Sequence, residues 1–589
     1  MFNLARSSWS DYNVKLISRG GGVFQRSAKS IKLSPEIKRC FTIVKDTVTP
    51  NELIRAILAA NVDLLWFGGI GTYVKASHET NSQVGDRAND AIRVDAPELR
   101  CRVVGEGANL GVTQRARVEF GLGGGRIYAD SIDNSAGVDC SDHEVNIKIL
   151  LDRAVVEKKL TVKGRNSLLA EMTDEVGELV LRDNYLQTQA INLIQAQGMA
   201  IFDNQTMLMR MLEKSDRLNR DVEFLPDDEV LIERAATHQG LAASETGVLM
   251  SYAKIWVYDE LLSSSLPDDS FLKGELVEYF PTPLRKKFLK GIERHRLRRE
   301  IIASMVTNSL INRMGGHFVY GLVERTGMTP DTITRAYVIA WTIFNFRDLW
   351  AAIEGLDNKV PAATQTAMLL DINRLMEWST LWFLRHGGAD MDIGRLVKEF
   401  TKGIDDLLCG FNAALPAHYR EDARDRATPY MDNGVPEDLA LKVANLVNLF
   451  SACDIVRLAL RRKMPVVDVA RLYFATGTRF HLGRLRAATD RVETQTHWQR
   501  LAAAALIEET YDHQLALTSL VLDGTWSKRG ERGKLDKENI LAVWEEANRQ
   551  AVDRVDQLLS DIGTSEINDL SMISVANRQL RALAASAGA

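Results

Sequence analysis

Cysteine is scarce in this sequence. Its 589 residues include five cysteines, at Cys40, Cys101, Cys140, Cys409 and Cys453. No two of them have the short spacing of a zinc knuckle or a redox motif, and a secreted disulfide framework would be denser. We therefore expect reduced thiols and a cytoplasmic protein.

Net charge and long apolar runs are also lacking. The formal charge is −5, which gives no indication of a surface that binds nucleic acid or an anionic membrane. The most apolar stretch, residues 336–346, is too short to span a bilayer and is followed by Arg347 and Asp348. The N-terminal residues lack the apolar core of a signal peptide. We expect a soluble protein with no nucleic-acid or membrane partner.

The composition is that of a globular protein, with 46% hydrophobic and 26% charged residues. Within residues 1–150, short β-rich runs at 41–44, 62–67 and 101–104 alternate with helical patterns, which predicts a parallel sheet with crossover helices. The remaining residues, 151–589, form a nearly continuous amphipathic helical pattern. The predicted fold is therefore α/β followed by a large all-helical domain.

Some helix boundaries can be predicted from local signals. Thr49, Pro50 and Glu52 have the spacing of a capping box with proline at the first helical position. Residues 329–331 are expected to begin another helix, and residues 387–388 to end one. Trp341, Trp350, Trp378 and Trp382 are interpreted as core residues because they lie within helical patterns.

The first candidate site is the turn Gly105-Glu-Gly107-Ala-Asn109-Leu-Gly111. It follows an apolar strand and precedes a predicted helix at 112–120, where backbone amides can approach an anionic ligand. Glycine-rich turns are common in α/β proteins, so spacing alone leaves a purely structural turn open. The Gly121–Gly125 cluster lacks the lysine and hydroxyl of a phosphate loop and is interpreted as a turn.

Asn109 has two interpretations. Its carboxamide can both donate to and accept from a nicotinamide or its ribose. An asparagine that tolerates a turn conformation explains the residue equally well.

The second candidate is the segment Asp130–Glu144. Ser141 and Glu144 have the spacing of a capping box, and we expect a helix to begin there. The Ser141 hydroxyl and the free amides of that turn could instead hold a carboxylate. His143 would lie in the first helical turn. With no matched carboxylate or cysteine evident, it is interpreted as a satisfied or solvent-facing histidine.

These segments resemble glutamate dehydrogenases in order and spacing. Gly105–Asn109 resembles the family's turn facing the nicotinamide, and Asp130–Glu144 resembles the family's next segment. Residues 62–69 resemble a strand end whose small residues pass beside the cofactor. The segments at 16–24, 26–30 and 85–90 are similar to the large NAD-specific bacterial type.

The resemblance implies a function and several roles. The fold would be an incomplete doubly wound, Rossmann-like domain in residues 1–150, closing a dinucleotide-binding domain, followed by a helical C-terminal domain in 151–589. The reaction would be NAD-dependent oxidation of L-glutamate to 2-oxoglutarate and ammonium, by a homo-oligomer. The implied cofactor-binding residues are Gly68, Gly69, Gly107, Asn109 and Asn134. Ser141 would contact the side-chain carboxylate of the substrate.

One departure from the family pattern bears on activity. The family's proton-transfer lysine and aspartate, and the glycine fingerprint for the pyrophosphate, lie N-terminal to these segments and have no counterpart here. We therefore expect no catalytic residues in this chain, and a truncated gene, a split gene or a misplaced start. A non-catalytic helical scaffold or regulatory fragment, and another NAD(P)-dependent amino-acid dehydrogenase, remain as alternatives.

Overall fold

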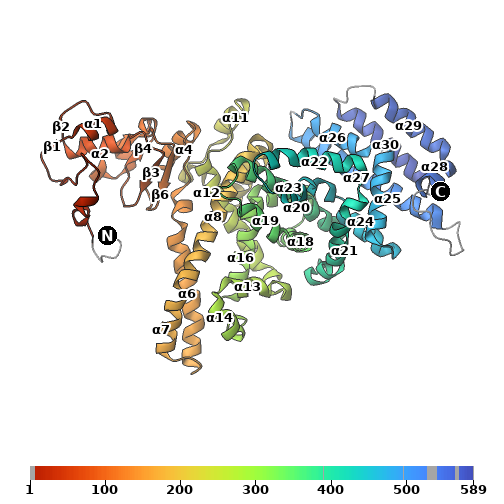
Figure 1. Ribbon diagram of the computed structural model, residues 1–589, viewed down its shortest axis with the longest axis horizontal. Coiled ribbons are helices and arrows are strands. Elements are labelled where there is room, and N and C mark those ends of the chain that lie inside the picture. The colour runs from red at the N-terminus through yellow and green to blue at the C-terminus, as the bar shows by residue number, and fades with distance from the viewer. Residues whose placement is uncertain (1–6, 389, 495, 527–539, 564–568, 588–589) are drawn as a thin grey trace. The chain divides into compact units, whose positions relative to one another are not determined.

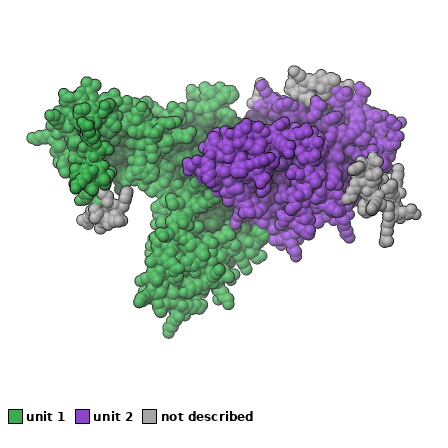
Figure 2. Space-filling view, viewed as in Figure 1, with its two compact units in different colours: residues 1–331 green, residues 332–589 purple. Residues whose placement is uncertain are grey.

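Two compact units make up the protein. The computed structural model describes residues 7–388, 390–494, 496–526, 540–563 and 569–587. Unit 1 comprises residues 1–331 and unit 2 comprises residues 332–589 (Figure 2). Both units are mostly helical, and the strands that the described residues form all lie in unit 1. The domain boundary predicted near residue 150 falls inside unit 1.

The strands of unit 1 pair two by two. β1 and β2 are antiparallel, whereas β3 pairs with β6, and β4 with β5, in parallel. Phe67 is in register with Glu106, so β3 and β6 end level with one another. The parallel pairing predicted from the sequence is confirmed for these two strands. The strands are β1 (Ile31–Lys32), β2 (Thr47–Val48), β3 (Leu64–Phe67), β4 (Val74–Lys75), β5 (Val94–Asp95) and β6 (Val103–Glu106).

One continuous doubly wound sheet is not formed by the described residues. The chain between β3 and β6 contains only the short helix α3 (Asn81–Val84), 3₁₀ turns and the two-residue strands β4 and β5. Phe67 and Val104 point into a core that also receives side chains from α2 (Pro50–Leu58) and α4 (Gln114–Leu122). On the opposite face, Trp66 is 59% exposed, whereas a doubly wound sheet is covered on both faces.

Local signals predicted one of the first two helices and missed the other. α2 begins as expected, because Thr49 Oγ1 accepts from the Glu52 amide and Glu52 accepts from the Thr49 amide. The strand predicted at residues 41–44 is wrong, since α1 (Pro35–Phe41) runs into that segment. Ser34 caps α1 by accepting from the Ile37 amide at 3.1 Å. The β-rich composition of residues 41–44 favoured a strand, and the capping residue was not recognised.

Helices form the rest of unit 1. Helix α8 packs against α6, α12 and α16, and α12 also packs against α16 and α4 (Figure 1). The helices that follow α4 in unit 1 are α5 (Asp130–Asp133), α6 (Ser135–Val156), α7 (Val162–Glu171), α8 (Thr173–Gln197), α9 (Phe202–Lys214), α10 (Arg220–Glu223), α11 (Asp228–Ala236), α12 (Ala243–Ser263), α13 (Lys273–Tyr279), α14 (Thr282–Lys287), α15 (Leu289–Ile292), α16 (Arg298–Met314) and α17 (Gly316–Thr326).

Unit 2 is a helical assembly with its own core, and α18 leads into it. The predicted helix start at residue 330 and the predicted end at residue 387 are both confirmed. Trp341, Trp350 and Trp382 are buried core residues as predicted, and the half-buried Trp378 stacks on Phe450. The helices are α18 (Pro330–Ile343), α19 (Phe346–Glu354), α20 (Ala362–His386), α21 (Ile393–Ala414), α22 (Ala417–Asp432), α23 (Glu437–Ala444), α24 (Ala452–Arg462), α25 (Val466–Arg479), α26 (Leu482–Arg491), α27 (His497–Trp526), α28 (Ile540–Ala547), α29 (Arg549–Gly563) and α30 (Leu570–Ala587).

Within the described parts of the chain, no single helix has the length and apolar character needed to cross a membrane. One bent pair, Glu437–Ala444 with Leu446–Arg462, meets that requirement by length and composition when the two helices are taken together across a 43° bend.

A buried ion pair joins the end of β6 to α4. Arg117 donates from Nε to Glu106 Oε2 at 2.6 Å and from Nη2 to Glu106 Oε1 at 3.0 Å. The same guanidinium lies 3.1 Å from Asp130 Oδ2, which also accepts from the Leu110 amide at 2.9 Å. Burial raises the pKa of the Glu106 carboxyl, and the Arg117 guanidinium opposes that shift. The three side chains together hold the turn that follows β6.

Replacing Arg117 by methionine should destabilise unit 1 strongly. The substitution leaves the Glu106 carboxylate, which is fully buried, without its counter-ion, and such changes cost about 3–5 kcal/mol. The matched control is Arg102→Met, because Arg102 pairs with Asp63 at the surface, where side chains are 81% and 90% exposed. That control should cost about 1 kcal/mol or less. Urea unfolding of both variants measures the difference, and equal losses would contradict the assigned role.

Candidate functional site

The site lies at the carboxyl edge of β3 and β6, where ligands bind in open parallel sheets. Gly68 and Gly69 follow β3 directly, and Gly107 follows β6. Both turns are tied together, since the Ala108 amide donates to Phe67 O at 3.1 Å. A Cβ on Gly69 would meet no atom within 4 Å, so there is open space beside this residue.

The glycines after β6 have a structural explanation that the sequence did not reveal. A Cβ on Gly107 would lie 2.2 Å from Cζ2 of Trp66, and one on Gly105 would lie 2.7 Å from Cε3 of the same ring. These two glycines therefore make room for the indole. Alternation along β3 places Trp66 on the uncovered face of the sheet, and its exposed ring adjoins Gly68, whose Cβ would lie 3.4 Å from Trp66 Nε1.

Two asparagines that are distant in sequence meet at this edge. Asn134 Nδ2 donates to Asn109 Oδ1 at 2.6 Å. Asn109 is exposed in the turn after β6, and Asn134 lies between α5 and α6. This leaves the Asn109 amide group and the Asn134 carbonyl oxygen with further bonding capacity toward a planar amide.

The predicted position of Ser141 at a helix start is wrong. Helix α6 begins at Ser135, and Ser141 lies inside it with its hydroxyl donating to Gly137 O at 3.2 Å. The backbone amides near Ser141 are therefore used within the helix and do not form an anion-binding turn. Ser141 is exposed, and it follows Asn134 by seven residues, about two helical turns, so the two positions share a helix face.

The interpretation of His143 as lacking a carboxylate partner is also wrong. His143 is 3% exposed, its Nε2 lies 3.9 Å from Asp139 Oδ1, and its ring stacks on Tyr279. Burial lowers the pKa of His143. Burial, with the nearby Asp183 carboxylate, raises the pKa of Asp139 to about 7. These groups face away from Ser141, on the side of α6 that packs against α8.

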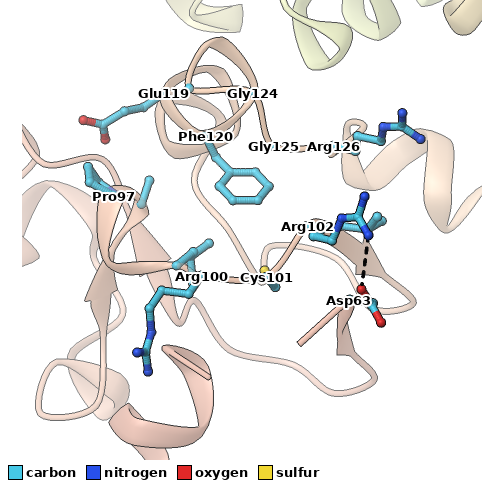
Figure 3. Close-up of a pocket in the computed structure, with 14 residues that line it drawn as sticks. Asp63, Pro97, Arg100, Cys101, Arg102, Glu119, Phe120, Gly124, Gly125 and Arg126 are labelled. Carbon is cyan, nitrogen blue, oxygen red and sulfur yellow. Dashed lines mark ion pairs between the residues drawn. The ribbon is translucent and has the colours of Figure 1, made fainter. Parts of the chain in front are cut away.

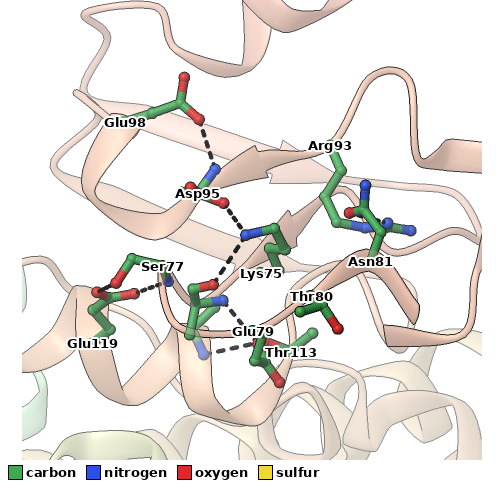
Figure 4. Close-up of polar contacts among 12 residues, drawn as sticks. Lys75, Ser77, Glu79, Thr80, Asn81, Arg93, Asp95, Glu98, Thr113 and Glu119 are labelled. Atoms are coloured by element: carbon green, nitrogen blue, oxygen red, sulfur yellow. Dashed lines mark hydrogen bonds and ion pairs between the residues drawn. The ribbon is translucent and has the colours of Figure 1, made fainter. Parts of the chain in front are cut away.

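A polar network supports the start of α4 (Figure 4). Glu79 Oε2 accepts from the Ala76 amide at 2.8 Å and from Thr113 Oγ1 at 2.6 Å. Thr113 in turn caps α4 by accepting from the Ala116 amide. Lys75 on β4 forms an ion pair with Asp95 on β5. The network fixes the helix that carries Arg117.

A cavity of about 1110 Å³ lies at the opposite, amino-terminal edge of β3 and β6 (Figure 3). Asp63 precedes β3 there, and Cys101 and Arg102 precede β6. Of the predicted Gly121–Gly125 turn, Gly121 belongs to α4, whereas Gly123, Gly124 and Gly125 follow the helix and contribute to the wall of the cavity. The predicted site residues do not line this cavity, so we do not assign it to the same site.

Comparison with known proteins gives matches along both units. Residues 1–194 match the family described as bacterial NAD-glutamate dehydrogenase, catalytic domain. Residues 238–582 match the family described as glutamate dehydrogenase, C-terminal.

Curated relatives are similar over the whole of this chain. The NAD-specific glutamate dehydrogenases of Pseudomonas aeruginosa and Halomonas elongata are 44% and 42% identical to it over 586 residues. That of Mycobacterium tuberculosis is 38% identical over 594 residues. In each comparison the match covers 100% of this chain and 36% of the relative. The chain belongs to the family of bacterial NAD-specific glutamate dehydrogenases.

Proposed function

We propose that this chain is part of an NAD-dependent enzyme that converts L-glutamate and water to 2-oxoglutarate and ammonium, with formation of NADH. The observation that carries the proposal is the bond between Asn134 and Asn109 at the carboxyl edge of β3 and β6. In this family member, the two segments that resemble the nicotinamide-facing part of glutamate dehydrogenases lie side by side. No other function has a comparable observation in its favour.

Asn109 and Asn134 are proposed to position the nicotinamide of NAD. Gly68 and Gly69 would give it room, which the open space beside Gly69 supports. Gly107 would act indirectly, because its lack of a side chain lets Trp66 lie flat at the same edge. NAD, when bound, supplies the acceptor for the hydride that leaves the substrate carbon.

Ser141 is proposed to contact the side-chain carboxylate of glutamate. Seven residues separate it from Asn134 along α6, which corresponds to roughly 10 Å along the helix axis on one face. A bound glutamate could extend along that face from the nicotinamide toward the serine hydroxyl, which can donate to a carboxylate.

The remaining proposals concern organisation. We propose that residues 1–150 close a Rossmann-like dinucleotide-binding domain and that residues 151–589 form the helical C-terminal domain. The match of residues 238–582 to a family described as C-terminal supports a C-terminal domain in the later part of the chain, and the catalytic-domain match extends past residue 150 to residue 194. A homo-oligomer is proposed from the family resemblance, and a cytoplasmic location from the scattered cysteines of the sequence.

The chain alone should not oxidise glutamate. The family's proton-transfer lysine and aspartate have no counterpart in its sequence, and binding energy does not replace missing acid–base groups. The nearby Glu106 and Asp130 carboxylates are both engaged by Arg117. Purified protein with saturating NAD and L-glutamate should form no NADH above a blank. Turnover that follows the protein through purification would contradict this assignment.

Asn109→Ala should weaken the use of NAD in a polypeptide that carries the complete activity. Loss of a typical hydrogen bond costs about 0.5–1.5 kcal/mol. Because Asn109 and Asn134 bond to each other, Asn134→Ala should have a comparable effect, and the double variant should lose less than the sum. The Michaelis constant for NAD is the measurement.

The matched control is Asn51→Ala, which removes an exposed carboxamide on α2 and should leave that constant unchanged. Wild-type constants in both asparagine variants would show that the pair has no part in cofactor binding.

Ser141→Ala separates a substrate contact from a structural role. Because Ser141 lies inside α6 and caps nothing, alanine should leave the melting temperature unchanged or slightly higher. The Michaelis constant for glutamate should rise more than that for NAD. If both constants and the turnover number stay at wild-type values, Ser141 does not contact the substrate.

A further inference from the structure

A group of ionisable side chains that surrounds the buried His143 lies behind the candidate site, between α6, α8 and α12. Asp139 and His143 are four residues apart on one face of α6, and Asp183 comes from α8. One potential ligand atom from each of the three lies within 4.8 Å of the other two. An imidazole and two carboxylates are a donor set that suits zinc and related divalent metals.

His143 is the observation that distinguishes this group from an ordinary acidic cluster. Its side chain is 4% exposed and its Nε2 faces Asp139. Its Nδ1 is buried without a hydrogen-bond partner, and Asp139 Oδ2 is buried without one as well. Buried polar groups in native proteins are nearly always satisfied, so the unpartnered Asp139 Oδ2 indicates that a ligand is needed beside this carboxylate, which His143 Nε2 faces.

We propose that Asp139, His143 and Asp183 form a binding site for a divalent transition-metal cation, with Zn²⁺ as its representative. Zinc holds nitrogen and oxygen ligands at roughly 2.0–2.2 Å, so neighbouring ligand atoms lie about 3.4 Å apart. His143 Nε2 and Asp139 Oδ1 are 3.9 Å apart, and the ligand atoms all lie within 4.8 Å of one another. Small side-chain rotations would shorten these distances to the value that zinc requires.

The surrounding groups support the ligands from outside. Tyr279 stacks on His143 with ring centroids 4.4 Å apart and fixes the plane of the imidazole. The Tyr279 hydroxyl donates to Asp142 Oδ2 at 2.8 Å and accepts from Asn146 Nδ2 at 2.9 Å. These two hydrogen bonds hold Tyr279 in place, and its ring in turn holds the imidazole of His143.

In the part of the chain that the structure describes, Lys254 on α12 is the cation whose charge acts on both carboxylates. Among the described residues it forms no ion pair within 4.0 Å with Asp139 or Asp183. It therefore does not occupy the space between the ligand atoms, and its positive charge opposes metal binding. Substitution of Lys254 can therefore distinguish a metal site from a group of carboxylates that the lysine neutralises.

The site would brace the start of α6. Asn184, the neighbour of Asp183, donates to Ile132 O at 2.8 Å and to Ser135 Oγ at 3.1 Å. A cation bridging Asp139 and Asp183 would add a second link between α8 and the helix start next to Asn134. The inference concerns metal binding and does not depend on the proposed dehydrogenase activity.

The test is calorimetric titration of Zn²⁺ into the full, chelator-treated chain. We expect one tightly bound Zn²⁺ per chain and a rise in melting temperature on its addition. Asp183→Asn and His143→Gln should each weaken binding by more than the roughly 10–100-fold typical of outer-shell substitutions. The control His78→Gln removes an exposed imidazole of unit 1 and should leave the tight site intact.

Lys254→Met distinguishes a metal site from a charge network neutralised by the lysine. If the proposal is correct, this variant binds Zn²⁺ at least as tightly as the wild type. The proposal is overturned if the wild type binds no Zn²⁺ tightly, or if both ligand variants bind it as the wild type does. It is also overturned if Lys254→Met loses binding while remaining folded. Should a ligand variant fail to fold, the wild-type and Lys254→Met titrations decide the question.

Discussion

The buried contact between Glu106 and Arg117 is the constraint on which the candidate site depends. Glu106 is the last residue of β6, and both of its oxygens are bound by one guanidinium from α4. Its Oε1 also accepts from the Val112 amide, so the turn is anchored at both ends by one carboxylate. Asp130 completes the arrangement by holding the middle of the turn at Leu110. Asn109, which is itself exposed, is thereby given a defined position.

Glycine occurs at different positions of this site for different structural reasons. Gly105 and Gly107 are required by the neighbouring indole of Trp66, because a methyl group would lie inside van der Waals contact with the ring. Gly69 meets nothing, and its lack of a side chain leaves space at the strand end. The glycines at this edge of the sheet therefore have two roles. Gly105 and Gly107 allow Trp66 to pack against the backbone, and Gly69 leaves open space.

Features set by neighbouring residues could be predicted from the sequence, and features set by tertiary packing could not. The cap of α2 and the start of α18 depend on three or four adjacent residues and were predicted correctly. The pairing of β3 with β6 followed from two apolar runs. The start of α6 was predicted too late in the sequence, because Ser141 and Glu144 have the spacing of a capping box. The helix begins six residues before Ser141, at Ser135.

The environment of His143 shows why sequence spacing is a poor guide to ionisable groups. Asp139 lies one helical turn away and was within reach of a periodicity argument. Asp183 lies forty residues further along, so only the packing of α6 against α8 brings it to this histidine, and Lys254 on α12 acts on the two carboxylates. Ser141 lies on the other, exposed face of the same helix, and Asn134 directly precedes that helix. One face of α6 can thus be fixed by buried charges, which leaves the other face rigid enough to hold a cofactor and a substrate in register.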